Sequence, residues 1–228
     1  MKRYTYSIIG ILGLASVAAA DYIDISAELV GQNLLEETTV PNYTIRIYAE
    51  INKGDRIEGV FGFCTKPLFV TPGIGTEFYQ SNFGGPTSTS INPDFFPTVP
   101  NLQWDSYMTI GALDQTGDPF ENNALMNVGI DWDNFENGGD LDANNGIWFI
   151  TPDDPQGESF NGRVLIAQLT IMDYEGTQAL PSFGANFVGH DAAGHSWLAW
   201  GELQWIPTPA TIALLPMAVL VGRRRRRS

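Results

Sequence analysis

The chain of 228 residues is poor in cysteine, histidine and positive charge: it has one Cys, two His and 12 Lys or Arg, against 26 Asp or Glu. Because Cys64 has no partner in the chain, no internal disulfide can form, and an apolar core must stabilise the fold. A formal charge of −14 opposes binding to nucleic acids, which proteins contact through clustered Lys and Arg. The composition therefore excludes a disulfide scaffold and a basic nucleic-acid-binding protein.

The first 20 residues have the layout of a secretory signal peptide. Lys2 and Arg3 precede an apolar stretch that is too short to span a bilayer. Small residues, Ala18 and Ala20, occupy positions −3 and −1 before Asp21. The pattern predicts an exported protein that signal peptidase cuts between Ala20 and Asp21.

The other end of the sequence has three parts. The motif Pro207-Thr208-Pro209 comes first, and the apolar segment 211–222 follows it as a short, marginal transmembrane helix. A cluster of five arginines comes last: Arg223, Arg224, Arg225, Arg226 and Arg227. By the positive-inside bias this cluster stays cytoplasmic and stops translocation. An uncut, tail-anchored protein is the alternative interpretation.

This tail, residues 206–228, resembles the PEP-CTERM sorting signals of Gram-negative bacteria, especially the planctomycete variety with Pro-x-Pro, a short apolar segment and a poly-Arg end. Pro207 and Pro209 match that motif, and Thr208 stands where the family has Glu. The resemblance implies that an exosortase-type protease of the inner membrane cuts near the Pro motif. The protein would then reach the cell surface or the extracellular polysaccharide matrix.

A strongly acidic domain, residues 21–206, lies between the two signals. It holds all 26 acidic residues and five of the basic ones, a net charge of −21. Such a surface repels anionic polymers and attracts divalent cations.

The domain shows the alternating apolar pattern of β-strands and no apolar periodicity of helix length. The segment 163–172 is apolar on both faces, which predicts a central strand. Short strands separated by Gly, Pro and Asn or Asp clusters predict an all-β, two-sheet β-sandwich of the jelly-roll type. We expect about nine strands: 23–29, 43–51, 57–63, 106–110, 126–132, 147–150, 163–172, 183–188 and 196–205.

Three segments, Trp104–Tyr107, Trp148–Gly157 and Val164–Thr170, resemble uncharacterised secreted sandwich domains that precede this type of tail in planctomycete proteins. The domain looks broadly cohesin-like, which implies adhesion or scaffolding rather than catalysis. The long segment 71–105, rich in Pro and Gly, is either a ligand-facing loop or disordered.

Oxygen ligands are concentrated in one acidic stretch, which predicts a calcium loop: Asp131, Asp133, Asp140, Asp142 and Asn144. Alternate carboxylates on a turning loop can converge on one Ca²⁺. The EF-hand pattern fails, because Asn145 replaces the required Gly and Thr151 replaces the bidentate Glu. The alternative is that these residues only form solvated turns.

Other candidate chemistry is weaker. His190, Asp191 and His195 resemble no known zinc spacing, so a polar hairpin end is the simpler interpretation of this segment than a zinc or copper site. Ser196 lacks a nucleophile-elbow sequence, and Cys64 is expected to be a buried, unreactive thiol.

Six Trp residues suggest a sugar-stacking surface, and 26 carboxylates leave a glycosidase pair open. Trp197 and Trp200 are three residues apart in a predicted strand, so they face opposite sides and only one of them can be exposed on a given face. Packing in the core is the default role for the others.

The sequence therefore predicts a non-enzymatic secreted protein of the cell surface or extracellular matrix, adhesive or structural, with the acidic stretch as a candidate calcium loop. The alternative is a secreted glycan-active hydrolase or a carbohydrate-binding module.

Overall fold

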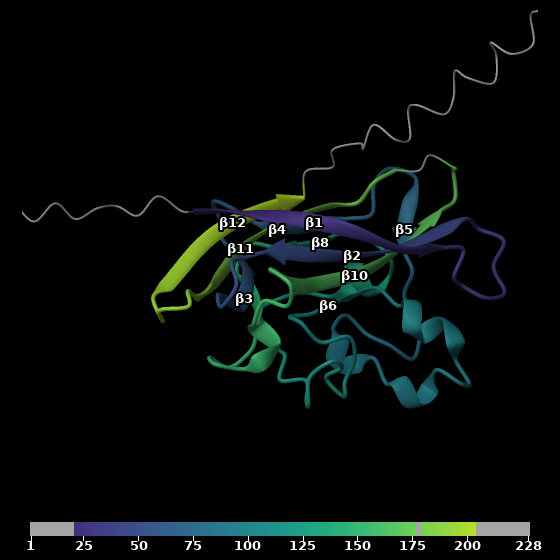
Figure 1. Ribbon diagram of the computed structural model, residues 1–228. Coiled ribbons are helices and arrows are strands. Elements are labelled where there is room, and N and C mark those ends of the chain that lie inside the picture. The colour runs from purple at the N-terminus through teal and green to yellow at the C-terminus, as the bar shows by residue number, and fades with distance from the viewer. Residues whose placement is uncertain (1–20, 177–178, 204–228) are drawn as a thin grey trace, which may run out of the picture.

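The computed structural model describes residues 21–176 and 179–203 (Figure 1). The predicted signal peptide (1–20) and sorting signal (207–228) lie outside the described residues. The single α-helix of the described part, α1 (Asp133–Glu136), has four residues. No helix in that part is both long and apolar enough to cross a bilayer.

Strands make up most of the regular structure in the described part, and four short 3-10 helices accompany them. The strands are β1 (Asp21–Gln32), β2 (Asn42–Glu50), β3 (Arg56–Gly62), β4 (Leu68–Thr71), β5 (Thr76–Phe78), β6 (Tyr107–Met108), β7 (Met126–Val128), β8 (Leu141–Ala143), β9 (Gly146–Phe149), β10 (Arg163–Asp173), β11 (Ser182–His190) and β12 (Ser196–Leu203). The 3-10 helices are η1 (Ser88–Ser90), η2 (Pro93–Phe95), η3 (Pro100–Trp104) and η4 (Pro155–Gly157).

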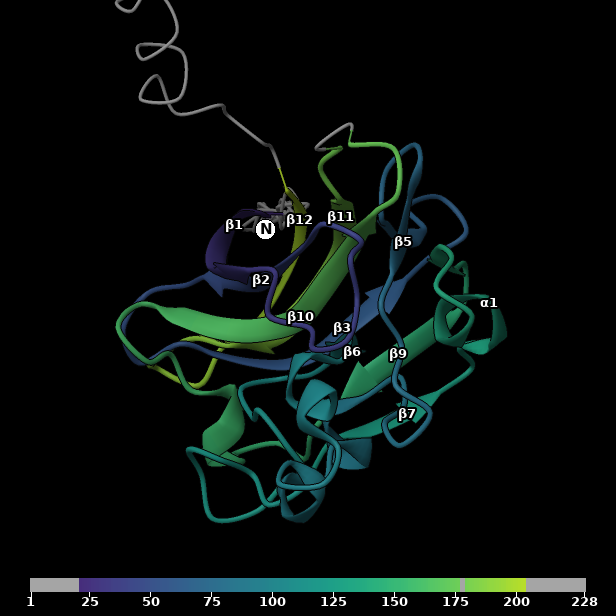
Figure 2. The same cartoon turned by 90° about the vertical axis from the view of Figure 1, so that its right-hand side faces the viewer.

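Hydrogen bonds join the strands into one sheet with the order β5-β10-β2-β1-β12-β11-β3-β9-β7. β4 pairs with β11 and β8, and β6 pairs with β10. Adjacent strands run antiparallel, except that β1 and β12 run parallel, with Asp21 opposite Ala199 and Ile25 opposite Leu203. Figure 2 shows the sheet curling from β1 and β2 round to β9 and β7.

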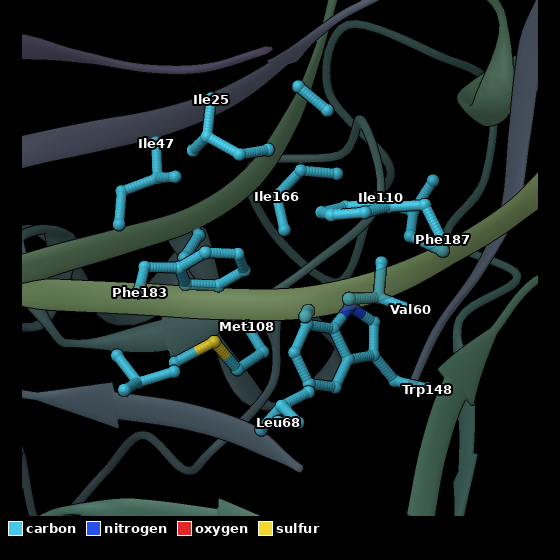
Figure 3. Close-up of a cluster of buried hydrophobic side chains, with 14 of the residues drawn as sticks. Ile25, Ile47, Val60, Leu68, Met108, Ile110, Trp148, Ile166, Phe183 and Phe187 are labelled. Atoms are coloured by element: carbon cyan, nitrogen blue, oxygen red, sulfur yellow. The ribbon is translucent and has the colours of Figure 1, made fainter. Parts of the chain in front are cut away.

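One apolar core fills the inside of this curl. Ile25 of β1, Phe187 of β11 and Trp148 of β9 come from distant parts of the sheet and meet in it (Figure 3). Trp148 is fully buried, and its Nε1 donates a hydrogen bond to the carbonyl of Thr109 at 3.1 Å. The predicted all-β class and β-sandwich architecture are confirmed, with the two layers joined as one continuous sheet.

β10 has the central place that its two apolar faces predict, because β2 lies on one side of it and β5 and β6 on the other. A bulge between Leu165 and Ala167 shifts the register with β2. Beyond the bulge, Ala167 and Leu169 belong to the core cluster. Gln168 lies on the opposite face of β10, where its side chain hydrogen-bonds to the segment that precedes β6.

The segment 71–105 is an ordered cover on β10 and not a disordered loop. It contains β5, η1, η2 and η3, and Ile91, Leu102 and Tyr107 form a second apolar cluster. Gln168 of β10 donates from Nε2 to the carbonyls of Gln103 (2.9 Å) and Asp105 (3.2 Å). This segment, rich in Pro and Gly, therefore folds compactly against the sheet.

Each of the nine predicted strands overlaps an observed strand, and β4, β5 and β8 are additional. The prediction that Cys64 is buried is wrong. β3 ends at Gly62, and Cys64 lies exposed in a tight turn that the backbone hydrogen bonds between Phe63 and Lys66 close.

Candidate functional site

Polar side chains gather at opposite ends of the long strands. One group lies at the β11–β12 turn, and the other surrounds β5 and α1. We describe the β11–β12 end first.

His190 connects three neighbouring strands through both nitrogens of its ring. Nδ1 lies 2.8 Å from Glu58 Oε1 on β3, and Nε2 lies 3.0 Å from Ser196 Oγ on β12. Sheet register produces this arrangement, since His190 at the end of β11 stands opposite Ser196 and opposite Arg56 on β3. We call Glu58, His190 and Ser196 the histidine relay.

A cavity of about 440 Å³ adjoins the relay, lined by Gly54, Arg56, Glu58, Pro152, Asp153, His190, Asp191, Ala192 and Gly194. The guanidinium group of Arg56 donates to Asp153 and to Glu158, both at 2.9 Å. Backbone hydrogen bonds and the side chain of His195 lower the pKa of Asp191. Three carboxylates therefore line the cavity, those of Glu58, Asp153 and Asp191, and the arginine that lines it already binds Asp153 and, outside the lining, Glu158.

The relay has the order hydroxyl, imidazole, carboxylate that activates a serine nucleophile. Acyl transfer also needs hydrogen-bond donors for the developing oxyanion. In the adjacent turn, the backbone N–H groups of Ala193 and His195 bind the Asp191 carboxylate, and that of Ala192 binds Asp55. These donors are already bound to negative charge, so the relay as it stands is better suited to joining strands than to stabilising an oxyanion.

A second cavity, of about 400 Å³, lies at the opposite end of the sheet. Its lining comes from the segment after β1, from β5 and the residues that follow it, from the end of α1, and from the end of β10. The residues are Leu35, Glu36, Thr38, Glu77, Phe78, Tyr79, Gln80, Asn101, Glu136, Asn137, Gly138, Met172 and Tyr174. We call it the α1–β5 pocket; Figure 2 shows α1 beside β5.

Hydrogen bonds hold the walls of this pocket in place. Asn101 accepts from the backbone N–H of Glu36 (2.7 Å) and donates to its carbonyl (3.1 Å). The N–H of Phe78 donates to the carbonyl of Gly138 at 2.8 Å, which ties β5 to the turn after α1. Gly138 has φ +86°, and a Cβ there would lie 2.9 Å from the carbonyl oxygen of Phe78, so the turn favours glycine.

Glutamates, tyrosines and amides form the polar part of the pocket. Partial burial, and then the charge of Glu77 and a hydrogen bond to it, raise the pKa of Tyr174. Burial, and then the charge of Asp105, raise the pKa of Tyr79. The Nε2 of Gln80 is buried and has no hydrogen-bond partner among the described residues. Among the described residues, no Lys, Arg or His lines the pocket.

Asp105 is fully buried and stabilises the segment that forms one wall of this pocket. It accepts hydrogen bonds from the backbone N–H groups of Ser81 (2.7 Å) and Gly85 (3.3 Å). Burial raises the pKa of Asp105 to about 7 against these hydrogen bonds, and the charge of Glu136 adds to the increase. The negative charge of Glu136, which lines the pocket, therefore contributes to the raised pKa of Asp105.

The residues predicted to bind calcium lie around α1 and β8. Asp131, Asp133, Asp140, Asp142 and Asn144 are all exposed. Asp131 accepts from the backbone N–H of Asp133 at 3.1 Å, as in an ordinary turn. Partial burial, and then the charge of Asp142, raise the pKa of Asp140. Among the described residues, no three His, Cys, Asp or Glu side chains are grouped to hold a metal ion. The calcium site stays a prediction.

The rings of the two histidines lie within hydrogen-bond distance of different side chains. His195 Nδ1 lies 3.0 Å from Asp191 Oδ2, whereas His190 faces Glu58 and Ser196. The predicted polar hairpin end is present, because residues 191–195 join β11 to β12.

The Trp residues follow the predicted division between the two faces. Trp197 packs against the core, whereas Trp200 stacks near Phe69, with the Lys66 ammonium group 5.4 Å from its ring centre. Trp132 and Trp148 both belong to the core packing.

Sequence reasoning did not single out Glu58, nor the pocket residues Glu77, Gln80 and Tyr174. The predicted strands 183–188 and 196–205 indicated a hairpin but left seven residues between them; only the observed extension of β11 to His190 makes the turn five residues long and places His190 opposite Ser196. Nothing local identified Glu58, because it lies 132 residues before His190.

No protein-family model and no curated protein matches this sequence. Among solved structures, the fold is similar to a type II cohesin domain from the cellulosome of Acetivibrio cellulolyticus. The two chains are 12% identical, and the match covers 80% of this chain and 95% of that one with a TM-score of 0.30.

Proposed function

We propose that this protein is an exported, non-enzymatic component of the cell surface or extracellular matrix, in which the acidic β-sandwich does adhesive or structural work. Signal peptidase would remove residues 1–20, and an exosortase-type protease would process the C-terminal tail. The host would be a Gram-negative bacterium.

One observation carries this proposal: the first and the last strand of the described domain pair with each other. β1 runs parallel to β12, with Asp21 opposite Ala199 and Ile25 opposite Leu203. A domain whose two end strands are hydrogen-bonded to each other would stay intact when the segments predicted to be cut are removed.

The distribution of charge supports a partner that is not anionic. The domain has five basic residues, and four of them contact other side chains. Arg56 binds two carboxylates, Arg163 binds Glu28 and lies over the ring of Tyr48, Lys66 lies over Trp200, and Arg46 donates to Gln168. The surface therefore presents mainly carboxylates and neutral groups to a partner.

The intact mass of the protein from fractionated native cells and medium tests this proposal. We expect a species in the envelope or matrix fraction that starts at Asp21 and ends near Pro207–Ala210, with added mass if the tail is replaced covalently. A species that retains Arg223–Arg227 in the membrane fraction would show an uncut anchor and contradict sorting to the matrix.

The histidine relay favours a second candidate function, a secreted hydrolase that uses Ser196 as nucleophile. Treatment with a fluorophosphonate, followed by peptide mass spectrometry, tests it directly, with Ser159→Ala as the control for Ser196→Ala. We expect no adduct on Ser196. An adduct that disappears in Ser196→Ala and persists in Ser159→Ala would establish the hydrolase and overturn the non-enzymatic proposal.

A further inference from the structure

The outer side of the sheet carries two neighbouring rows of apolar side chains that the core does not bury. Ala199, Phe187, Val60 and Trp148, on β12, β11, β3 and β9, are core residues. Side chains alternate along a strand, so the residues before and after each of them point outward. The strand register aligns the outward residues in a first row of Leu198, Val188, Gly59, Phe149 and Met126, and a second row of Trp200, Asn186, Phe61, Ile147 and Val128. We call these two rows the outer apolar face.

Much of the outer apolar face is open to solvent. Leu198, Met126 and Val128 are between 42% and 61% exposed. The side chain of Ile147 lies over Gly59, since a Cβ there would be 2.9 Å from its Cδ1, so the apolar surface continues across the glycine. Neither row contains a charged residue. Contiguous apolar surfaces of this kind usually mark docking sites.

The chain itself continues from the margin of this face. β12, which contributes Leu198 and Trp200, ends at Leu203, and residues 204–228 follow. The segment 211–222 is apolar, and as a helix it would be about 18 Å long. The strands of the face, from β12 to β7, are together about 19 Å wide at the usual strand spacing. Residues 204–210 can extend over about 20 Å, so they can place the apolar segment on any of these strands. A tethered segment also has a high effective concentration at the face.

Charge favours the same segment. Asp142 of β8 is exposed beside the outer apolar face, opposite Phe69 of β4, whose ring centre lies 6.3 Å from that of Trp200. Partial burial, and then the charge of Asp142, raise the pKa of Asp140, so these two carboxylates repel each other. Arg223–Arg227 directly follow the apolar segment and would neutralise them. The predicted signal peptide is apolar too, but its two basic residues precede its apolar stretch and no Arg cluster follows it.

We propose that, in the uncut chain outside a membrane, the segment 211–222 packs across the outer apolar face and brings Arg223–Arg227 beside Asp140 and Asp142. The docked segment shields the two rows from water and from other chains. Removal of the tail, which belongs to the proposed function, would uncover the face for a partner. The docking itself does not rest on the proposed function, because it concerns the chain before any cut.

Disulfide trapping tests this docking, because the sole cysteine of the chain lies at the face. Cys64 is exposed and follows Phe63, whose ring meets that of Phe61 edge-on with the centres 4.9 Å apart. Ala218→Cys places a second thiol in the apolar segment. The full chain is oxidised with copper phenanthroline in dilute, detergent-free buffer. Isotopically light and heavy chains are mixed, so that mass spectrometry separates intrachain from interchain disulfides. We expect a rapid intrachain disulfide between Cys64 and position 218, since a disulfide requires close approach of the two residues.

A variant of the face and a matched control, both made in the chain with Ala218→Cys, separate docking from chance collision. Val128→Asp puts a charge on the second row, at a position 61% exposed, and should slow the intrachain reaction at least about fivefold. Phe160→Asp, at a position 74% exposed outside both rows, should leave the rate unchanged. Far-UV circular dichroism verifies that both variants fold.

Two further variants test the choice of segment. Serines in place of Arg223–Arg227 should slow the reaction about threefold at low salt, because the attraction to the carboxylates of β8 is lost. Ser16→Cys, in the predicted signal peptide of a chain that keeps Ala218, should form its disulfide at least about fivefold more slowly than Ala218→Cys, since tethering alone remains.

The inference is wrong if no intrachain disulfide forms, or if Val128→Asp and Phe160→Asp react equally fast. A disulfide found only between two chains would assign the face to a second copy, and an equally fast reaction of Ser16→Cys would show that any tethered apolar segment reaches the face; either result overturns the inference. The proposed function fails separately, because an uncut tail in the membrane fraction of native cells would contradict sorting to the matrix without changing the trapping result.

Discussion

The Nδ1 atom of His190 lies 2.8 Å from the Oε1 atom of Glu58, at a point where the Glu58 side chain is only 11% exposed. Removing the imidazole would leave a nearly buried carboxylate without this partner, which typically costs about 1–3 kcal/mol. We expect His190→Ala to lower the free energy of unfolding by that amount, as measured by urea denaturation.

The second histidine supplies the control. His195 also lies beside a carboxylate, that of Asp191, but its side chain is 80% exposed. His195→Ala should change the free energy of unfolding by less than about 0.5 kcal/mol. Equal losses in the two variants would show that the histidine relay does not stabilise the sheet.

The raised pKa of Asp105 predicts that the stability of the protein depends on pH. Its pKa in the folded protein is about 7, against 3.8 without the fold, so between these values the folded state holds a proton that the unfolded state has lost. The free energy of unfolding should therefore fall as the pH rises from about 4 to about 7, and this contribution should level off above pH 7. Thermal unfolding across this range measures it.

An uncharged replacement isolates this contribution. Asp105→Asn should remove the fall in stability that Asp105 causes, while Asp94→Asn, at an exposed position, should retain it. An unchanged slope in Asp105→Asn would assign the pH dependence to other groups.

Gly62 sits where β3, β4 and β8 approach closely. A Cβ on Gly62 would lie 1.8 Å from the carbonyl oxygen of Ala143 and 2.7 Å from the backbone nitrogen of Leu68. Since both are backbone atoms, Gly62→Ala should cost at least about 3 kcal/mol in urea denaturation. Gly31→Ala meets only the flexible end of Leu34 at 3.0 Å and should cost less than about 1 kcal/mol. Similar costs for the two would contradict the close approach.

The melting temperature, measured with and without Ca²⁺, tests the calcium prediction. If Ca²⁺ bridges Asp140 and Asp142, it relieves their mutual repulsion, and the melting temperature should rise when Ca²⁺ replaces a chelator. Asp142→Asn should then abolish the rise, while Asp118→Asn, away from the acidic stretch, should preserve it. A melting temperature that does not respond to Ca²⁺ would end the prediction.

Much of the fold could be predicted because alternation along a strand records which face is buried. β2 shows this directly: Ile45, Ile47 and Ala49 are buried, and Arg46 and Tyr48 between them are partly exposed. β4, β5 and β8 escaped prediction because three or four residues next to Gly, Pro or Asn carry too little pattern. Cys64 was misplaced because the apolar run before it gives no sign that the strand stops at Gly62.

The candidate sites were harder to predict, because pairing between distant strands creates them. The hairpin places His190 opposite Ser196, but Glu58 reaches the ring only through the pairing of β3 with β11. The α1–β5 pocket likewise joins Glu36, Glu77, Glu136 and Tyr174 from four separate segments. No spacing in the sequence relates such residues.

The parallel pairing of β1 with β12 has a consequence for the order of folding. β1 can form its antiparallel pair with β2 early, but its other edge must wait for residues 199–203, at the far end of the domain. Contacts between such distant segments slow folding, since a long loop must close before they form. A chain threaded outward through a membrane, as proposed here, would then complete its sheet only after the last strand had crossed. The late pairing of β1 with β12 would leave the domain unfolded while it crosses the membrane. The complete sheet would then form only outside.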